Sequence, residues 1–152
     1  MTPGKISCKI IADRVGWIDR MLNEIGRMPL TSYETFTDDR RNVLAAESCL
    51  RRALEALMDV SRHILAKGFG LGVTEYKQVA LEIQEVGVLS HEDARLLKIL
   101  AGYRNRMVHF YHEIVNQELY EICRDKTQDI QKVKEAIIVW IKDHPDLMDE
   151  AL

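Results

Sequence analysis

Apolar residues at helical spacing run through the middle of this chain and constrain its fold more than any other feature. They follow alternating steps of three and four residues over three heptads: Val43, Ala46, Leu50, Ala53, Leu57, Val60 and Ile64. This spacing places all of them on one face of a long helix, which we expect to run from a cap at Thr37 or Asp38 to Gly68. Because such a face must be covered, the pattern predicts a helical core or a helical dimer interface.

Four further segments also have the periodicity of amphipathic helices. They run from about Lys5 to Gly26, from Thr74 to Gly87, from Ser90 to about Met107 and from about Asn116 to Lys142. Glycine, proline or a capping serine marks most of their ends. No segment alternates apolar and polar residues as a half-buried strand does. We therefore predict an all-α, antiparallel bundle of about five helices.

Length and composition favour one domain. A chain of 152 residues supports a single core, and 47% hydrophobic with 30% charged residues is typical of a globular protein. No repeat or linker divides it, so we predict one domain over residues 1–152. No apolar stretch approaches the roughly 20 residues of a membrane span, and the N-terminal segment becomes charged before a signal peptide develops. We expect a cytoplasmic protein with no membrane partner.

Charge is distributed unevenly along the chain. The 21 Lys and Arg residues are outnumbered by 24 Asp and Glu residues, so the net charge is -3 and no global positive field is available to hold nucleic acid. The stretch from Arg95 to His112, RLLKILAGYRNRMVHFYH, nevertheless contains no acidic residue. A basic helix end is commonly a solvated cluster that complements the helix dipole. Here the residue types also fit a chemical need.

Arg104 and His109 are the residue types that RNA cleavage without a metal requires. The 2′-hydroxyl must lose a proton, the leaving oxygen must gain one, and the charge on the phosphate must be stabilised. A histidine that titrates near neutrality can exchange the protons, and an arginine presents a fixed planar fork to the phosphate. This pair is our candidate catalytic site.

The spacing of this pair limits how it can act. Residues five apart lie about 140° apart on an ideal helix, so Arg104 and His109 diverge there. They can meet at one phosphate if the helix ends or distorts near them, or if a second subunit brings another copy alongside. We favour the second subunit, because a two-fold axis would sum two small basic clusters into one anion-attracting cleft.

No metal or cofactor is expected. The three cysteines, Cys8, Cys49 and Cys123, include no CxxC pair, which argues against a zinc ribbon and favours reduced, buried thiols. Residues 91–93 (His-Glu-Asp) suggest ligands, but consecutive residues diverge around a helix.

The order AGYRNRMVHFYHEI resembles a known signature. An arginine, an asparagine, three residues, a histidine, one residue and a tyrosine is the pattern of HepT-like toxins in the HEPN superfamily, and Arg104, Asn105, His109 and Tyr111 match each fixed position. The helices that precede the signature have the order expected of that family, so the resemblance extends from about Ile11 to Ile141.

This resemblance implies an all-α homodimer that acts as a metal-independent ribonuclease, with the arginine and histidine of both copies lining a shared cleft. By the same resemblance, Arg104 stabilises the scissile phosphate, His109 acts as acid or base, and Asn105 orients or helps to bind the RNA. The implied gene partner is a small MntA-like nucleotidyltransferase, an antitoxin that attaches AMP to the signature's tyrosine, here Tyr111.

Two more residues are auxiliary candidates. Arg106 lies within the same acid-free stretch, and His112 shares the helical face of Asn105 and His109, where it can carry a proton or contact RNA.

In a rival interpretation, the chain has the HEPN surface but catalyses no reaction. In it, the chain is a noncatalytic helical module that binds a nucleotide or a nucleotidyltransferase partner. The intact pair of Arg104 and His109 favours the enzyme. A purely structural dimer would leave the acid-free stretch unexplained.

Overall fold

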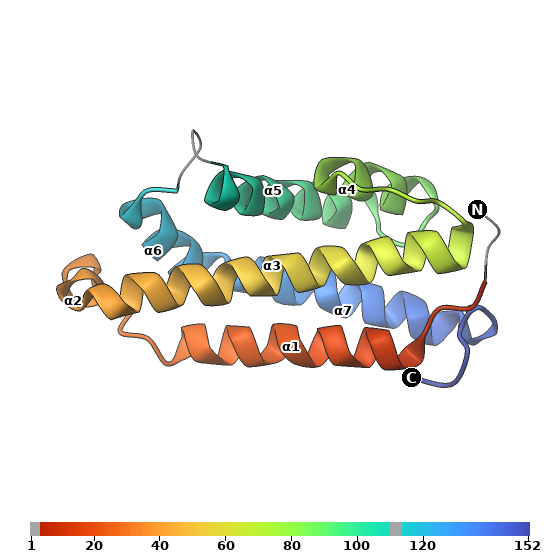
Figure 1. Cartoon of the computed structure of the whole chain (residues 1–152), viewed down its shortest axis with the longest axis horizontal. Helices are drawn as coiled ribbons and strands as arrows, with labels where there is room; N and C mark the ends of the chain where they lie inside the picture. Colours follow the sequence, from red (N-terminus) through yellow and green to blue (C-terminus); the bar gives the residue numbers. More distant parts are fainter. Residues whose placement is uncertain (1–3, 110–113) are drawn as a thin grey trace.

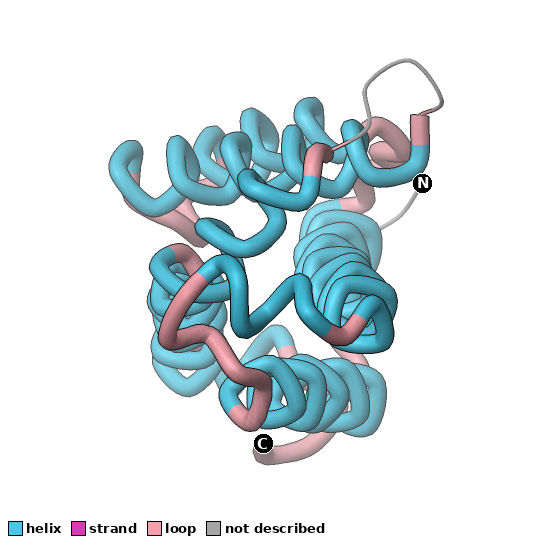
Figure 2. The backbone as a smooth tube through the Cα atoms, turned by 90° about the vertical axis from the view of Figure 1, so that its left-hand side faces the viewer, coloured by secondary structure: helices cyan, strands magenta, loops and turns pink. Residues whose placement is uncertain are grey.

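The computed structural model describes residues 4–109 and 114–152, which form seven α-helices and one short 3-10 helix. The α-helices are α1 (Cys8–Gly26), α2 (Tyr33–Asp38), α3 (Arg40–Phe69), α4 (Tyr76–Glu85), α5 (His91–Val108), α6 (Asn116–Asp125) and α7 (Thr127–Asp143), and the 3-10 helix is Pro145–Leu147. The described chain is drawn as helices and loops only (Figure 2). The all-α class is confirmed.

Helix α3 spans the length of the molecule, and the other elements are arranged around it (Figure 1). Helix α1 runs antiparallel to α3 along one side, while α4 and α5 lie side by side along the opposite side and α7 lies behind. The four long helices α1, α3, α5 and α7 alternate in direction, so the predicted antiparallel bundle is confirmed.

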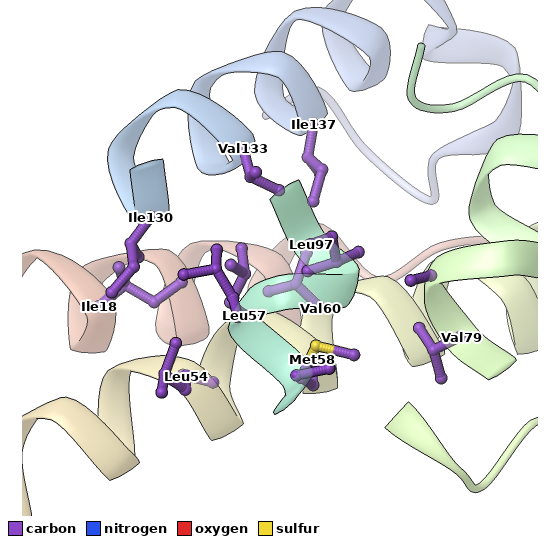
Figure 3. Packing of buried hydrophobic residues seen from close by; sticks show 14 of the residues in the cluster. Ile18, Leu54, Leu57, Met58, Val60, Val79, Leu97, Ile130, Val133 and Ile137 are labelled. Carbon is purple, nitrogen blue, oxygen red and sulfur yellow. The ribbon is translucent and has the colours of Figure 1, made fainter. Parts of the chain in front are cut away.

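The core forms where these helices meet α3. All seven residues of the apolar run are buried, which confirms the predicted core face. Figure 3 shows buried side chains from α1, α3, α4, α5 and α7 packed together, among them Ile18, Leu54, Leu57, Val60, Val79, Leu97, Ile130, Val133 and Ile137. Burying each such aliphatic side chain contributes on the order of 1.5–3 kcal/mol, so the core fixes the positions of the helices that carry the polar groups.

Three features of the bundle differ from the prediction. The segment predicted as one helix from Asn116 to Lys142 is two helices, because the helix breaks at Lys126. The connection after Pro29 contains α2, a helix of 6 residues that buries Phe36. The cap of α3 is Asp39, whose side chain accepts a hydrogen bond from the Arg41 N–H (2.9 Å), one residue beyond the predicted positions.

The two ends of the described chain are bound to each other. Ile6 pairs with Met148 in a single parallel bridge, and the Asp149 side chain accepts a hydrogen bond from the Cys8 N–H (2.9 Å). On α3, His63 accepts a hydrogen bond from the Ser7 N–H through Nε2 (2.9 Å). Within the residues described, none of the helices combines the length and apolar character needed to cross a bilayer.

Candidate active site

Helix α5 ends inside the sequence signature. Val108 is its last residue, and His109 has extended backbone angles (φ -91°, ψ 125°) while its N–H still donates to the Asn105 carbonyl (3.0 Å). Arg104, Asn105 and His109 line one hollow of about 440 Å³ within a single chain. One chain thus provides a hollow that the three residues share, and the contribution of a second subunit stays a prediction.

The hollow lies where α3, α4 and α5 meet. Its remaining lining residues come from α3, from the loop before α4 and from the first turn of α4: Arg62, Thr74, Glu75, Tyr76 and Lys77. Sequence reasoning missed Arg62, Tyr76 and Lys77. Arg62 is one of several charged residues on α3 with no motif around it, and nothing in the sequence shows that the start of α4 faces the end of α5.

Two groups hold the Arg104 guanidinium. Its Nε lies 3.4 Å from Oε1 of Glu55 on α3, an ion-pair distance without hydrogen-bond alignment. Its Cζ lies 4.5 Å from the centre of the Tyr76 ring, a cation–π contact. Nη1 is 3.5 Å from Oδ1 of Asn105. Since the side chain is 25% exposed, the guanidinium is restrained on one edge and one face and still open to the hollow.

Positive charge predominates in the hollow. Arg62, Lys77 and Arg104 line it against one carboxylate, Glu75. Beneath it on α3, burial raises the pKa of Asp59, while Arg14, Arg62 and Arg104 act in the opposite direction. An anion that enters the hollow therefore meets two exposed or half-buried cations besides Arg104, although the whole chain is acidic.

Arg106 points away from this hollow toward α6. Its two terminal nitrogens each lie 2.8 Å from a carboxylate oxygen of Glu118, a bidentate ion pair that connects the end of α5 to α6. Its Cζ also lies 5.6 Å from the centre of the Tyr103 ring. The guanidinium of this auxiliary candidate is thus occupied by a carboxylate.

Tyr111 and His112 lie outside the described residues. Among the residues described, no three His, Cys, Asp or Glu side chains gather closely enough to hold a metal ion. The cysteines are free thiols, and burial raises the pKa of Cys123 to about 12, which disfavours its thiolate form.

With the geometry established, the sequence can be compared with known proteins. The sequence model of the Ribonuclease HepT-like family matches residues 18–137. This chain belongs to that family. Among curated proteins, it is similar to the tRNA nuclease HepT of Aphanizomenon flos-aquae (strain 2012/KM1/D3), with 27% identity over 112 residues that cover 73% of this chain and 76% of the relative.

Solved structures share the fold of this HepT-like chain. A tri-AMPylated Shewanella oneidensis HEPN toxin in complex with MNT antitoxin superposes with a TM-score of 0.75 at 21% identity, covering 86% of this chain and 97% of that one. The cytosolic protein YutE from Bacillus subtilis, of unknown function, gives a TM-score of 0.73 at 16% identity, with coverages of 88% and 90%. At these identities the likeness concerns the fold alone.

Proposed function

We propose that this HepT-like chain is a metal-independent endoribonuclease toxin that cleaves cellular RNA and is the toxin of a toxin–antitoxin pair. One observation carries the proposal: Arg104, Asn105 and His109 line the same solvent-open hollow, with the guanidinium already restrained. The family membership and the similarity to a curated tRNA nuclease support it.

The proposed reaction is an internal transesterification. The 2′-oxygen attacks phosphorus, the bond from phosphorus to the 5′-oxygen breaks, and the products are a 2′,3′-cyclic phosphate and a 5′-hydroxyl. His109 takes the proton from the 2′-hydroxyl or gives one to the leaving oxygen. Arg104 stabilises the extra charge on the phosphate oxygens, and Asn105 helps to bind or orient the RNA. His112 is an auxiliary proton carrier or RNA contact.

A homodimer would complete this chemistry. With one imidazole and one guanidinium from each copy across a two-fold axis, one histidine acts as base while the other acts as acid on the same linkage. The composite cleft would also double the local positive charge that an acidic protein can present to RNA.

We further propose that an MntA-like nucleotidyltransferase neutralises the toxin by AMPylation of Tyr111. This residue follows His109 by two positions, so an attached AMP would place bulk and negative charge beside the imidazole and compete with RNA for Arg104. The AMPylated HEPN toxin bound to MNT antitoxin that shares this fold supports the assignment.

The first test is RNA degradation in the presence of EDTA. We expect the purified protein to cleave RNA there, and Arg104→Ala or His109→Ala to lower the rate by at least about a hundredfold, since each removes a group that acts on the transition state. Lys142→Ala, an exposed change on α7, is the matched control. Activity that persists in both site variants would refute the residue roles, and a requirement for divalent metal would refute the mechanism.

The second test concerns Tyr111. Tyr111→Phe removes the hydroxyl that would accept AMP and keeps the ring, so we expect the variant to retain cleavage and to escape inhibition by the nucleotidyltransferase with ATP. Mass spectrometry would follow the added AMP. Its addition to the phenylalanine variant would show that another residue is modified. Under the noncatalytic alternative, the wild type and all of these variants leave the RNA uncleaved, and the chain still binds its nucleotidyltransferase partner.

A further inference from the structure

The hollow that contains Arg104 and His109 continues into two others. These have volumes of about 300 and 480 Å³, and Lys77 lines all three hollows. Together they form a surface groove between α4 and α5, two helices that lie side by side (Figure 1). We call it the α4–α5 groove, and the residues that line these two further hollows are Glu75, Lys77, Gln78, Ala80, Leu81, Gln84, His91, Ala94, Arg95, Lys98, Gly102, Asn105, Arg106 and His109.

The α5 side of the groove is a single helical face. Its residues follow steps of three, four, three and four: Arg95, Lys98, Gly102, Asn105 and His109. At about 1.5 Å per residue, the face extends roughly 15 Å from Arg95 to Asn105. Gly102 lies within this stretch, and a Cβ at that position would meet nothing within 4 Å. The groove is therefore open from the catalytic hollow to the first half of α5.

Three cations of this groove have no carboxylate partner in the described structure. Arg106 also lines the groove but is paired with Glu118 of α6. Across residues 4–109 and 114–152, Lys77, Arg95 and Lys98 form no ion pair, and all three side chains are exposed. Glu92 and Asp93, in the first turn of α5, are paired with Lys132 of α7. Glu75 is the acid that lines the groove.

The floor of the groove is apolar. Ala80, Leu81 and Ala94 line it between the cations, and Leu81 remains 50% exposed. Duplex RNA presents phosphates and ribose hydroxyls on its outside and keeps its bases stacked inside, so an apolar floor would gain little from it. A single strand offers both a phosphate backbone and unstacked base faces. The combination of unpaired cations with an apolar floor therefore favours a single strand.

We infer that the α4–α5 groove binds the single-stranded RNA segment adjoining the scissile linkage, with Arg95 and Lys98 contacting its phosphates and Lys77 connecting the groove to the catalytic hollow. This inference rests on the proposed nuclease function and defines its substrate as RNA with an unpaired segment beside the cleavage point. The groove would supply affinity, while Arg104 and His109 supply the chemistry.

The test compares Arg95→Ala/Lys98→Ala with the control Lys9→Ala/Lys142→Ala, which removes the same charge from α1 and α7. The probe is a fluorescein-labelled oligouridine of roughly twelve nucleotides, carrying 2′-O-methyl groups that remove the nucleophile. We expect the groove variant to raise Kd about tenfold at 100 mM salt and to reduce the salt slope of log Kd by about 1.4, at about 0.7 per lost phosphate contact. The control should change neither quantity by comparable amounts.

Kinetics separate this inference from the proposed function. With the cleavable oligonucleotide, the groove variant should raise KM about tenfold and keep kcat within about twofold. Unchanged Kd, an equal loss in the control, or an equal effect on duplex RNA would overturn the inference. The inference would also be overturned if the groove variant bound RNA normally but no longer bound the nucleotidyltransferase, since the groove would then be a binding surface for a protein. If the wild type cleaves nothing and the Kd effect is present, the nuclease proposal fails and the groove assignment stands.

Discussion

Arg104 is restrained by groups of different chemistry. The Glu55 carboxylate near its Nε favours the cation but leaves the terminal nitrogens available, because the contact is made at one edge and lacks hydrogen-bond alignment. The Tyr76 ring, 4.5 Å from Cζ, covers one face of the guanidinium and limits rotation of a side chain that otherwise has many rotamers. Preorganising a cation before the phosphate arrives lowers the cost of binding the transition state.

Replacing Tyr76 tests this positioning role. We expect Tyr76→Leu to lower kcat/KM for RNA about tenfold, because a cation–π contact of about 1–2 kcal/mol is lost where the guanidinium is largely shielded. Tyr76→Phe keeps the ring and should remain within about twofold of the wild type. Thermal unfolding of both variants would show whether the start of α4 is intact. A leucine variant as active as the wild type would show that the ring does not position Arg104.

Among the helices, periodicity predicted those whose apolar residues form a long stripe, and α1, α3, α4 and α5 follow their predicted ranges closely. It missed the break at Lys126 because the apolar phase continues through it: Cys123 and Ile130, one heptad apart, are both buried. It missed α2 because 6 residues are too few to show a period. The signature names Arg104, Asn105 and His109 as candidates, but the sequence does not show that residues of α3 and α4 line the same hollow.

An ion pair also connects α5 to α6. Arg106 and Glu118 join the end of α5 to α6, and their side chains are 40% and 32% exposed, so the pair contributes under about 1 kcal/mol to stability. We expect Arg106→Ala and Glu118→Ala to lower RNA cleavage by the same modest factor, and the double variant to be no worse than either single change. That result would show that Arg106 acts by holding α5. A far larger loss from Arg106→Ala would show that its guanidinium contacts RNA directly.

At the scale of the whole molecule, the distribution of charge favours one side of the bundle for the proposed binding of RNA. The chain carries a net charge of -3, so long-range attraction is weak, and the local excess of cations lies at the hollow and along the α4–α5 groove. Helices α1 and α7 lie on other sides of α3, and several of their basic residues are paired with acids (Figure 1). The bundle therefore presents one side to a polyanion, and dimerisation about an axis near that side would bring two such surfaces together.

A mixed dimer tests whether two copies act on one linkage. One subunit would be wild type and the other Arg104→Ala/His109→Ala, with different affinity tags so that only the mixed species is purified. If both imidazole and guanidinium pairs act on the same phosphate, losing one pair removes a proton donor or acceptor together with charge stabilisation. We then expect less than about a tenth of the wild-type rate. If each hollow is complete by itself, as its convergence within one chain allows, the mixed dimer retains about half the rate, because one of two equal sites remains.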